Sequence, residues 1–250
     1  MGSEPSPATV TVMPGPDDAS TPRVRPAVVA FDVNETLLDL GPVRATLIEL
    51  GQPADLMPTV FARTLLTGMA GALVGNWFPF RAAFDASLAQ TTTLGTRKRA
   101  QVADAFGELA PHPDVEPALR RLNEAGVRVV TLSHGSPGIA EAALARGGLT
   151  PLVERSLSSE SIRAWKPAPQ AYLWAAGVCD VPPGRLALVA AHGWDVQGAQ
   201  RAGLTGAWFP RAERSYPAVY DVPHVQAPDL AAAVGALLAF PDAEMAESVR

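Results

Sequence analysis

Short apolar runs that stop at small polar residues recur along this chain and predict its architecture. The first run, residues 28–31, ends at Asp32. Two further runs, residues 127–132 and 186–190, end before Ser133 and Ala191. Aliphatic, β-branched runs of this length that are bounded by turn residues are typical of buried strands. The pattern therefore predicts strands that each deliver a polar segment at their end.

Helix-like stretches separate the predicted strands. They cover residues 117–125, 139–146, 170–177 and 196–202, and glycines stand at or just after their ends. Strands that alternate with helices of this length indicate right-handed βαβ units and a parallel sheet, an α/β fold. Ligands collect outside the carboxyl ends of such strands. The carboxylate of Asp32 is therefore predicted to lie at a binding or catalytic site.

Residues 42–112 follow a different pattern. They contain amphipathic helical candidates at 58–67, 81–90 and 97–109 and no convincing strand. We interpret this region as a helical insertion after the first strand, placed over the sheet's carboxyl edge, where it could close the site from water. The predicted organisation is a flexible tail (1–25), a core (26–41 and 113–240) and a helical cap (42–112).

Composition limits the class of protein. With 250 residues, 48% of them hydrophobic, the chain can bury a substantial core. A net charge of -5 gives no electrostatic reason to expect nucleic acid or an anionic membrane as partner. The single cysteine, Cys179, suits a reducing cytoplasm, and no apolar run approaches the roughly 20 residues that cross a bilayer. We predict a cytoplasmic protein without nucleic-acid or membrane partners.

Four motifs, taken in order, identify a family resemblance. They are Asp32-Val-Asn-Glu-Thr36, Ser133-His-Gly-Ser136, Lys166-Pro-Ala-Pro-Gln-Ala-Tyr172 and His192-Gly-Trp-Asp195. In this order, at predicted strand ends and around a helical insertion, they make the chain resemble the haloacid dehalogenase superfamily, and within it the (S)-2-haloacid dehalogenases. The resemblance implies a Rossmann-like core with a helical cap after the first strand, a 2-haloacid substrate, a homodimer, and no metal or other cofactor.

The resemblance also implies a reaction for these residue types. Asp32 would displace halide from C2 of the substrate and form an aspartyl ester, which water then hydrolyses. The ammonium of Lys166 would favour the ionised nucleophile, since an opposite charge lowers a carboxyl pKa by about 1 to 3 units. Ser133 and Thr36 would orient the Asp32 carboxylate by hydrogen bonds. Asp195 would hold Lys166 and help to position the water.

Plainer structural explanations exist for single residues. Asp32 could cap a turn, Lys166 could belong to an exposed turn before Pro167, Asp195 could be a helix N-cap, and Ser133 could only cap or turn. The order of all four motifs on one βα scaffold favours an active site.

The phosphatases of the superfamily are the main alternative. Expelling an alkoxide needs a proton donor, which those enzymes place two residues after the nucleophile, and phosphoryl transfer needs Mg2+ on further carboxylates. This chain has Asn34 at the first position and Ala191 at the expected magnesium ligand. Both losses fit dehalogenation, because a halide leaves without a proton.

A haloacid needs a cation for its carboxylate and walls for its apolar part. Arg63 is our choice for the cation, because the similar enzymes carry an arginine at about this place on the cap, with Arg44 and Arg81 as rivals. A solvated helix arginine is the plainer explanation for Arg63. Trp77, Phe78 and Trp194 could form apolar walls or belong to the core.

Several positions depart from the usual dehalogenase pattern. Asn34 stands where a tyrosine is common, His134 and His192 replace asparagines, and Ala190 replaces a serine. One hypothesis is a changed pocket in which a histidine binds halide or assists the hydrolytic water. Others are a catalytically silent protein that binds a small carboxylate, and a metal held by Asp32, Asp195 and the two histidines. The candidate substrate-binding residues are Asn34, Thr36, His134, Tyr172, His192 and Trp194.

Overall fold

The core of the molecule is a six-stranded parallel sheet with strand order β5-β4-β1-β6-β7-β8. A computed structural model of the chain describes residues 23–211 and 213–243, so residues 1–22 of the predicted tail lie outside the described part. The predicted α/β fold with a parallel sheet is confirmed. The strands are β1 (Val28–Phe31), β4 (Arg128–Ser133), β5 (Arg155–Ser158), β6 (Leu186–Ala190), β7 (Thr205–Trp208) and β8 (Val225–Gln226).

Strand β1 lies at the centre of this sheet, between β4 and β6. Val28 is opposite Arg128 on β4 and Leu186 on β6. All four residues of β1 are fully buried, as expected for a parallel strand that is covered on both faces. The in-register pairing brings the residues that follow β1, β4 and β6 to the same edge of the sheet.

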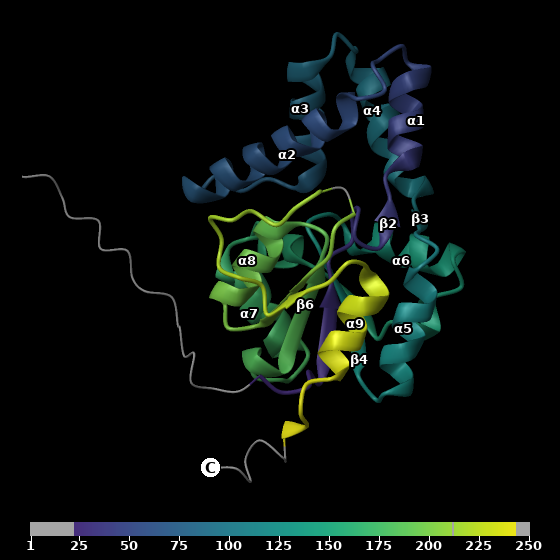
Figure 1. Cartoon of the computed structure of the whole chain (residues 1–250). Helices are drawn as coiled ribbons and strands as arrows, with labels where there is room; N and C mark the ends of the chain where they lie inside the picture. The colour runs from purple at the N-terminus through teal and green to yellow at the C-terminus, as the bar shows by residue number, and fades with distance from the viewer. Residues whose placement is uncertain (1–22, 212, 244–250) are drawn as a thin grey trace, which may run out of the picture.

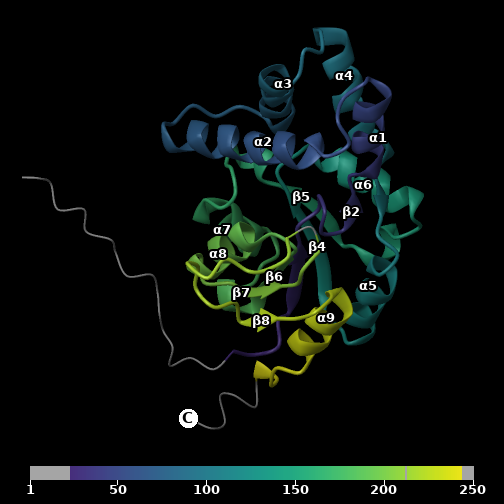
Figure 2. The same ribbon diagram turned by 45° about the horizontal axis from the view of Figure 1, so that its top comes forward.

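Helices cover both faces of the sheet (Figures 1 and 2). On one face, helices α5, α6 and α9 pack into a core that includes Val29 and Phe31 of β1. On the other face, α7 and α8 pack into a second core that includes Val28 and Ala30. The helices are α5 (Val115–Glu124), α6 (Pro137–Arg146), α7 (Pro169–Val178), α8 (Gly193–Arg201) and α9 (Leu230–Leu238), with short 3-10 turns η2 (Thr150–Leu152), η3 (Ser159–Ile162) and η4 (Pro183–Arg185).

A helical cap follows β1 and lies beyond the carboxyl edge of the sheet (Figure 1). The chain enters it through β2 (Leu38–Asp39) and leaves it through β3 (Ala110–Pro111), and these two strands pair antiparallel. Strand β3 lies in a region for which the sequence predicted no strand, because two residues are too few to show a periodicity. The cap contains α1 (Gly41–Glu49), α2 (Leu56–Leu73), α3 (Phe80–Thr91), α4 (Thr96–Asp104) and η1 (Ala105–Glu108).

The longest cap helix, α2, is unusually apolar for a surface element. It has 18 residues with a mean hydropathy of 1.2, so by length and composition it could cross a membrane, although a third of it is buried within the protein. From the sequence alone, no apolar run of this length was expected. In the fold, α2 packs on α3, and Met57, Val60 and Leu65 are buried in the core that β1 also joins.

Candidate active site

The turn after β1 places the first two polar groups of the site. Glu35 adopts a left-handed conformation (φ 63°), and the N–H groups of Leu37 and Leu38 both donate to the carbonyl of Val33. This tight turn lets the Thr36 hydroxyl donate to Oδ2 of Asp32 at 2.8 Å. The same hydroxyl accepts from the Ala191 N–H at 3.0 Å. Thr36 therefore fixes the carboxylate and ties the turn to the end of β6.

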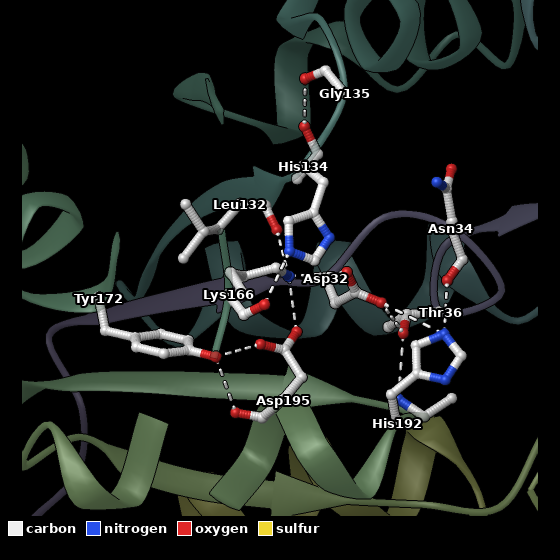
Figure 3. Close-up of polar contacts among 12 residues, drawn as sticks. Asp32, Asn34, Thr36, Leu132, His134, Gly135, Lys166, Tyr172, His192 and Asp195 are labelled. Atoms are coloured by element: carbon white, nitrogen blue, oxygen red, sulfur yellow. Dashed lines mark hydrogen bonds and ion pairs between the residues drawn. The ribbon is translucent and has the colours of Figure 1, made fainter. Parts of the chain in front are cut away.

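The Lys166 ammonium lies beside the carboxylate, between Asp32 and Asp195, and uses all three of its N–H donors (Figure 3). Its Nζ donates to Oδ1 of Asp32 at 2.8 Å, to Oδ2 of Asp195 at 2.6 Å and to the carbonyl of Leu132 at 2.9 Å. The side chain is fully buried. The structure thus brings together three of the predicted catalytic residues, Asp32, Lys166 and Asp195.

The charges of this buried group decide the state of Asp32. Burial raises the pKa of the Asp32 carboxyl, but the positive charges of Lys166 and His192 outweigh burial and hold that pKa below its ordinary value. Burial likewise lowers the pKa of Lys166, and the carboxylates of Asp195 and Asp32 raise it above its ordinary value. At neutral pH, Asp32 is an ionised carboxylate beside a charged ammonium.

Tyr172 stands behind Asp195, away from the expected substrate side. Its hydroxyl lies 2.5 Å from Oδ1 of Asp195 and 3.2 Å from the backbone carbonyl of Asp195. Burial and the Asp195 charge raise the pKa of Tyr172 well above its ordinary value, so the phenol stays protonated and donates. The side chain is fully buried, so the structure places it as a support of Asp195 and not beside a substrate.

The Ser133 hydroxyl makes no hydrogen bond to the nucleophile. Its hydroxyl donates to the carbonyl of Gly135 at 3.0 Å, two residues along the chain. The hydroxyl that was predicted to orient Asp32 therefore forms a hydrogen bond within the turn that begins the loop after β4. In this arrangement the hydrogen bonds to the two Asp32 oxygens come from Lys166 and Thr36.

A cavity of about 580 Å³ lies between the cap and the core next to these residues. Arg44, Phe61 and Leu65 line it from the cap, and His192, Trp194 and Arg211 line it from the core. His192 also faces the nucleophile, because its Nε2 lies 3.9 Å from Oδ2 of Asp32. The predicted residues His192 and Trp194 therefore form part of the cavity wall, and His192 is the one beside Asp32.

The structure does not bring Arg63 to this cavity. Arg63 is exposed on α2, with its Nη1 3.5 Å from Oε1 of Gln90 on α3. Ala62, one residue earlier, lines the cavity instead, and one residue corresponds to about 100° around a helix of 3.6 residues per turn. Arg81 pairs with Asp104 at 2.6 Å on the exposed cap surface. Of the three arginines considered from the sequence, Arg44 is the one at the cavity.

Five rings form a row from the cap into the core. Centroid distances are 5.7 Å for Phe61 to His192, 5.6 Å for His192 to Trp194, 5.6 Å for Trp194 to His134 and 4.6 Å for His134 to Trp165. The indole Nε1 of Trp165 donates to the carbonyl of Phe78 in the cap at 3.0 Å. Of the other aromatic candidates, Trp77 lies under the guanidinium of Arg163, outside this row.

The two histidines of the row differ in charge. Burial and the Lys166 charge lower the pKa of His134 to about 3, so His134 is neutral, and its Nε2 must carry the proton to donate to the Lys166 carbonyl at 3.1 Å. Both ring nitrogens of His192 face acceptors. Nδ1 lies 3.3 Å from Oε1 of Glu213, and Nε2 lies 3.2 Å from the carbonyl of Asn34. Only a doubly protonated ring satisfies both contacts.

The surroundings of His192 favour that charged form. Burial lowers its pKa, but the Glu213 hydrogen bond and the charge of Asp32 outweigh burial, so the pKa is raised. Glu213 also accepts from the Gly193 N–H at 2.9 Å. Glu213 was not among the predicted site residues, because it lies in the loop after β7 with no motif around it. The Asn34 side chain points away from Asp32, and its backbone carbonyl makes the contact (Figure 3).

Asp32, Asp195 and the two histidines, the ligands of the hypothetical metal site, have other partners in the structure. Both carboxylate oxygens of Asp195 are bonded, one to Lys166 and one to Tyr172, and the Lys166 ammonium occupies the space between the two carboxylates. In the described part of the chain, no group of three or more histidine, cysteine, aspartate or glutamate side chains is arranged to hold a metal ion. This donor set fits an ammonium and not a metal.

The sheet order, the cap and the carboxylate–lysine pair define a class of hydrolase, and comparison with known proteins gives the family. A sequence model of the haloacid dehalogenase-like hydrolases matches residues 26–203. The chain belongs to this family.

Its relatives include dehalogenases of 2-haloacids. The (S)-2-haloacid dehalogenase of Xanthobacter autotrophicus is 31% identical over 191 residues, 73% of this chain and 74% of that enzyme. That of Pseudomonas sp. (strain YL) is 25% identical over 213 residues, 82% of this chain and 92% of that enzyme. The solved structure of the L-2-haloacid dehalogenase RSc1362 superposes with a TM-score of 0.79 at 27% identity, covering 87% of this chain and all of that chain.

Proposed function

We propose that this protein is a hydrolytic dehalogenase of short 2-haloalkanoic acids that works through an ester on Asp32. The observation that carries the proposal is the state of Asp32, which is buried, ionised and held at both oxygens, by Lys166 at Oδ1 and by Thr36 at Oδ2. A carboxylate that is fixed and stripped of water in this way is a suitable nucleophile for carbon. The relatives named for this activity support the same conclusion.

The reaction that this geometry supports has two steps. A carboxylate oxygen of Asp32 bonds to C2 of the substrate while the carbon–halogen bond breaks, and halide leaves with the bonding electrons. Water then adds to Cγ of the ester, the bond from Cγ to the ester oxygen breaks, and the 2-hydroxy acid leaves. Neither step expels an alkoxide from phosphorus, so neither needs a carboxylic acid at position 34. Lys166 keeps Asp32 ionised before attack and after hydrolysis.

Arg44 is the cation that we assign to the substrate carboxylate. It is exposed to the cavity and has no ion-pair partner among the described residues. The other cavity arginine, Arg211, is held by both carboxylate oxygens of Asp114 at 3.0 Å. An arginine can bind a carboxylate through two parallel hydrogen bonds. Phe61 and Leu65, on the same wall as Arg44, would face the apolar part of the substrate.

Measurement of halide release tests the proposal. Purified protein is incubated with chloroacetate or with either enantiomer of 2-chloropropionate, with and without EDTA, beside the variant Asp32→Asn. The proposal expects release that resists EDTA and is abolished in Asp32→Asn. Magnesium-dependent hydrolysis of a phosphate ester without halide release would instead favour the phosphatase, and binding of a haloacid without turnover would favour the silent carboxylate-binding protein.

Labelled water tests the intermediate. Under single-turnover conditions in water enriched in heavy oxygen, the ester mechanism requires the label to enter the Asp32 carboxylate, because water attacks Cγ. Mass spectrometry of the peptide that contains Asp32 detects it. Label found in the hydroxy acid alone would show direct attack of water on C2 and would overturn the ester mechanism.

Two expectations about the whole protein stay predictions. A cytoplasmic location follows from the composition and the single cysteine, and a homodimer follows from the family resemblance. Sedimentation equilibrium over a range of protein concentrations would determine the oligomeric state.

A further inference from the structure

Glu35 belongs to the first motif, and the proposed reaction gives it no role. It immediately precedes Thr36, whose hydroxyl holds Oδ2 of Asp32. Its backbone has a φ of 63°, in the left-handed region that glycine adopts without strain and that other residues rarely occupy. Strained residues of this kind concentrate at functional sites. The side chain is therefore the place to look for the reason that a glutamate stands here.

The Glu35 side chain lines the cavity beside the nucleophile and has no partner there. It is half-buried in the cavity wall. Among the described residues, its carboxylate makes no hydrogen bond and no ion pair. Burial raises the pKa of the Glu35 carboxyl, although the positive charges of His192 and Arg44 act against burial. The carboxylate is thus available to a ligand that enters the cavity.

Two of the five charged residues that line the cavity lack a partner in the described part of the chain. They are Arg44, a cation, and Glu35, an anion. Because Arg44 is assigned to the carboxylate of the haloacid, Glu35 remains for another part of the same molecule. The other three lining residues are paired, Arg211 with Asp114 and His192 with Glu213.

The size of the cavity leaves room for a longer substrate. Its volume of about 580 Å³ lies within the range of about 300–1,000 Å³ that is typical of pockets for drug-sized ligands. A molecule as small as 2-chloropropionate fills only part of that space. Leu40, Met57 and Pro58 add apolar wall for the methylene groups of a longer chain. The site can therefore hold a 2-haloacid whose chain extends beyond C3.

We propose, on the basis of the proposed function, that Glu35 forms a subsite for a cationic group at the far end of a 2-haloacid. The substrate class is then a 2-haloacid that carries an alkylammonium or guanidinium group on its chain. Arg44 binds the carboxylate, Asp32 attacks C2, and Glu35 accepts charge-assisted hydrogen bonds from the cation. The two charges also fix the orientation of the substrate, because the reversed molecule would bring like charges together.

Three chlorinated acids of matched length test the subsite. 2-Chloro-5-guanidinopentanoate ends in a forked cation, 2-chloro-7-methyloctanoate in a forked neutral group and 2-chloroheptanedioate in a forked anion. The readout is kcat/KM for halide release, taken as the ratio of the cationic to the neutral acid and as the ratio of the anionic to the neutral acid. A ratio measured in one preparation does not depend on the fraction of the protein that is active.

Glu35→Gln should move the two ratios in opposite directions. The ratio for the cationic acid should fall about 10-fold or more, because the acceptor of its hydrogen bonds has become neutral. The ratio for the anionic acid should rise. Asp39→Asn is the matched control, because the Asp39 charge acts on Glu35 from outside the cavity wall and the new amide oxygen can still accept from the Gly41 N–H. Both ratios should be kept in this variant.

Glu35→Gly separates a binding role from a structural one. Glycine adopts a φ of 63° without strain, so this variant should unfold at an equal or higher temperature and should still lose the preference for the cationic acid. A structural role of Glu35 predicts the reverse, a lower unfolding temperature with both ratios kept.

Calorimetric titration with halogen-free 5-guanidinopentanoate separates the subsite from the proposed function. Its Kd should rise about 10-fold or more in Glu35→Gln and stay the same in Asp39→Asn. If no chlorinated acid releases halide but this binding behaves as expected, the proposed function fails and the subsite stands. If halide is released and Glu35→Gln shifts neither ratio, the subsite fails and the proposed function stands. Equal shifts in Asp39→Asn would show a general effect of charge and overturn the subsite, and the absence of both halide release and binding would overturn both proposals.

Discussion

Lys166 is the residue on which two buried carboxylates depend. It is the ammonium that both Asp32 and Asp195 contact, at 2.8 and 2.6 Å. Removal of one member of a buried ion pair leaves uncompensated charge and costs about 3–5 kcal/mol. We therefore expect Lys166→Met to abolish halide release and to lower the free energy of unfolding in urea by about that amount at pH 7.

The same variant has a defined pH dependence. The pKa of Asp32 is lower in the folded protein than in the unfolded chain. The ionised carboxylate therefore stabilises the fold above the unfolded pKa, and this contribution is lost as pH falls through the folded pKa. The stability difference between Lys166→Met and the unaltered protein should therefore shrink toward acid pH. Arg201→Met is the control, because Arg201 and Asp221 form a part-exposed pair and such pairs contribute about 1 kcal/mol or less.

Tyr172 and Tyr216 make a matched pair of phenols. The Tyr172 hydroxyl bonds Asp195, whereas the Tyr216 hydroxyl is buried without a partner among the described residues. Loss of a partner for a buried charged acceptor costs about 1–3 kcal/mol. Tyr172→Phe should lower the unfolding free energy by that amount and slow halide release, while Tyr216→Phe should be neutral or slightly stabilising. Equal effects of the two changes would contradict the support role of Tyr172.

At the residue scale, the sequence could predict contacts that lie within motifs. Asp32, Thr36 and Asp195 follow β1 and β6, whose ends meet at one edge of the sheet, so their convergence follows from the fold. Lys166 lies in the loop between η3 and α7, and its motif was the signal for it. Glu213 reaches the site from a loop whose path depends on packing, and no local pattern reveals it. Ser133 shows the opposite case, because a nearby carbonyl competes for a hydroxyl that the motif assigns to the nucleophile.

At the scale of elements, α2 decides how the cap meets the core. A Cβ on Gly68 of α2 would lie 2.4 Å from ring atoms of Trp165, the residue before Lys166. We expect Gly68→Ala to push α2 from Trp165, to destabilise the protein by about 1–3 kcal/mol and to slow halide release. Gly177→Ala in α7 is the control, because nothing lies within 4 Å of its added Cβ, so it should stabilise by about 0.5–1 kcal/mol. Thermal unfolding and halide assays measure both.

The same helix shows why the cap could be predicted only in part. Its helical periodicity was clear, but apolar side chains lie on its outer face as well, with Leu66 65% and Leu73 88% exposed. A helix that is apolar on two sides gives no sequence signal for which side faces the cavity. The choice between Arg63 and its rivals therefore needed the packing of α2 on α3.

At the scale of the whole molecule, buried histidines should set the response to acid. Burial lowers the pKa of His134 to about 3 and that of His224 to about 4, and it lowers the pKa of His112 as well. At His134 and His224 the unfolded chain binds protons near pH 6.5 and the folded protein does not. Stability should therefore fall as pH falls below about 6.5, by at most about 1.4 kcal/mol per pH unit for each of these two histidines.

Urea unfolding between pH 6.5 and 5 measures this slope. His224→Asn should reduce it by about one proton, whereas Lys98→Gln, an exposed change that does not titrate in this range, should leave it unchanged. An identical slope in His224→Asn would show that this histidine is not held neutral in the folded protein. His192 acts in the opposite direction. Its raised pKa adds stability at low pH, and this stability is lost as pH rises through the folded pKa. The effect of His192 on the slope therefore lies above pH 6.5.

The row of rings has an optical consequence. Trp194 stacks on both histidines, with centroids 5.6 Å from each. A protonated imidazole quenches indole fluorescence and a neutral one quenches it much less, and His134 is neutral throughout. The emission of Trp194 should thus brighten as pH rises through the raised pKa of His192. The protein therefore carries a fluorescent reporter of the charge of His192, the ring beside its nucleophile, that can be recorded without any label.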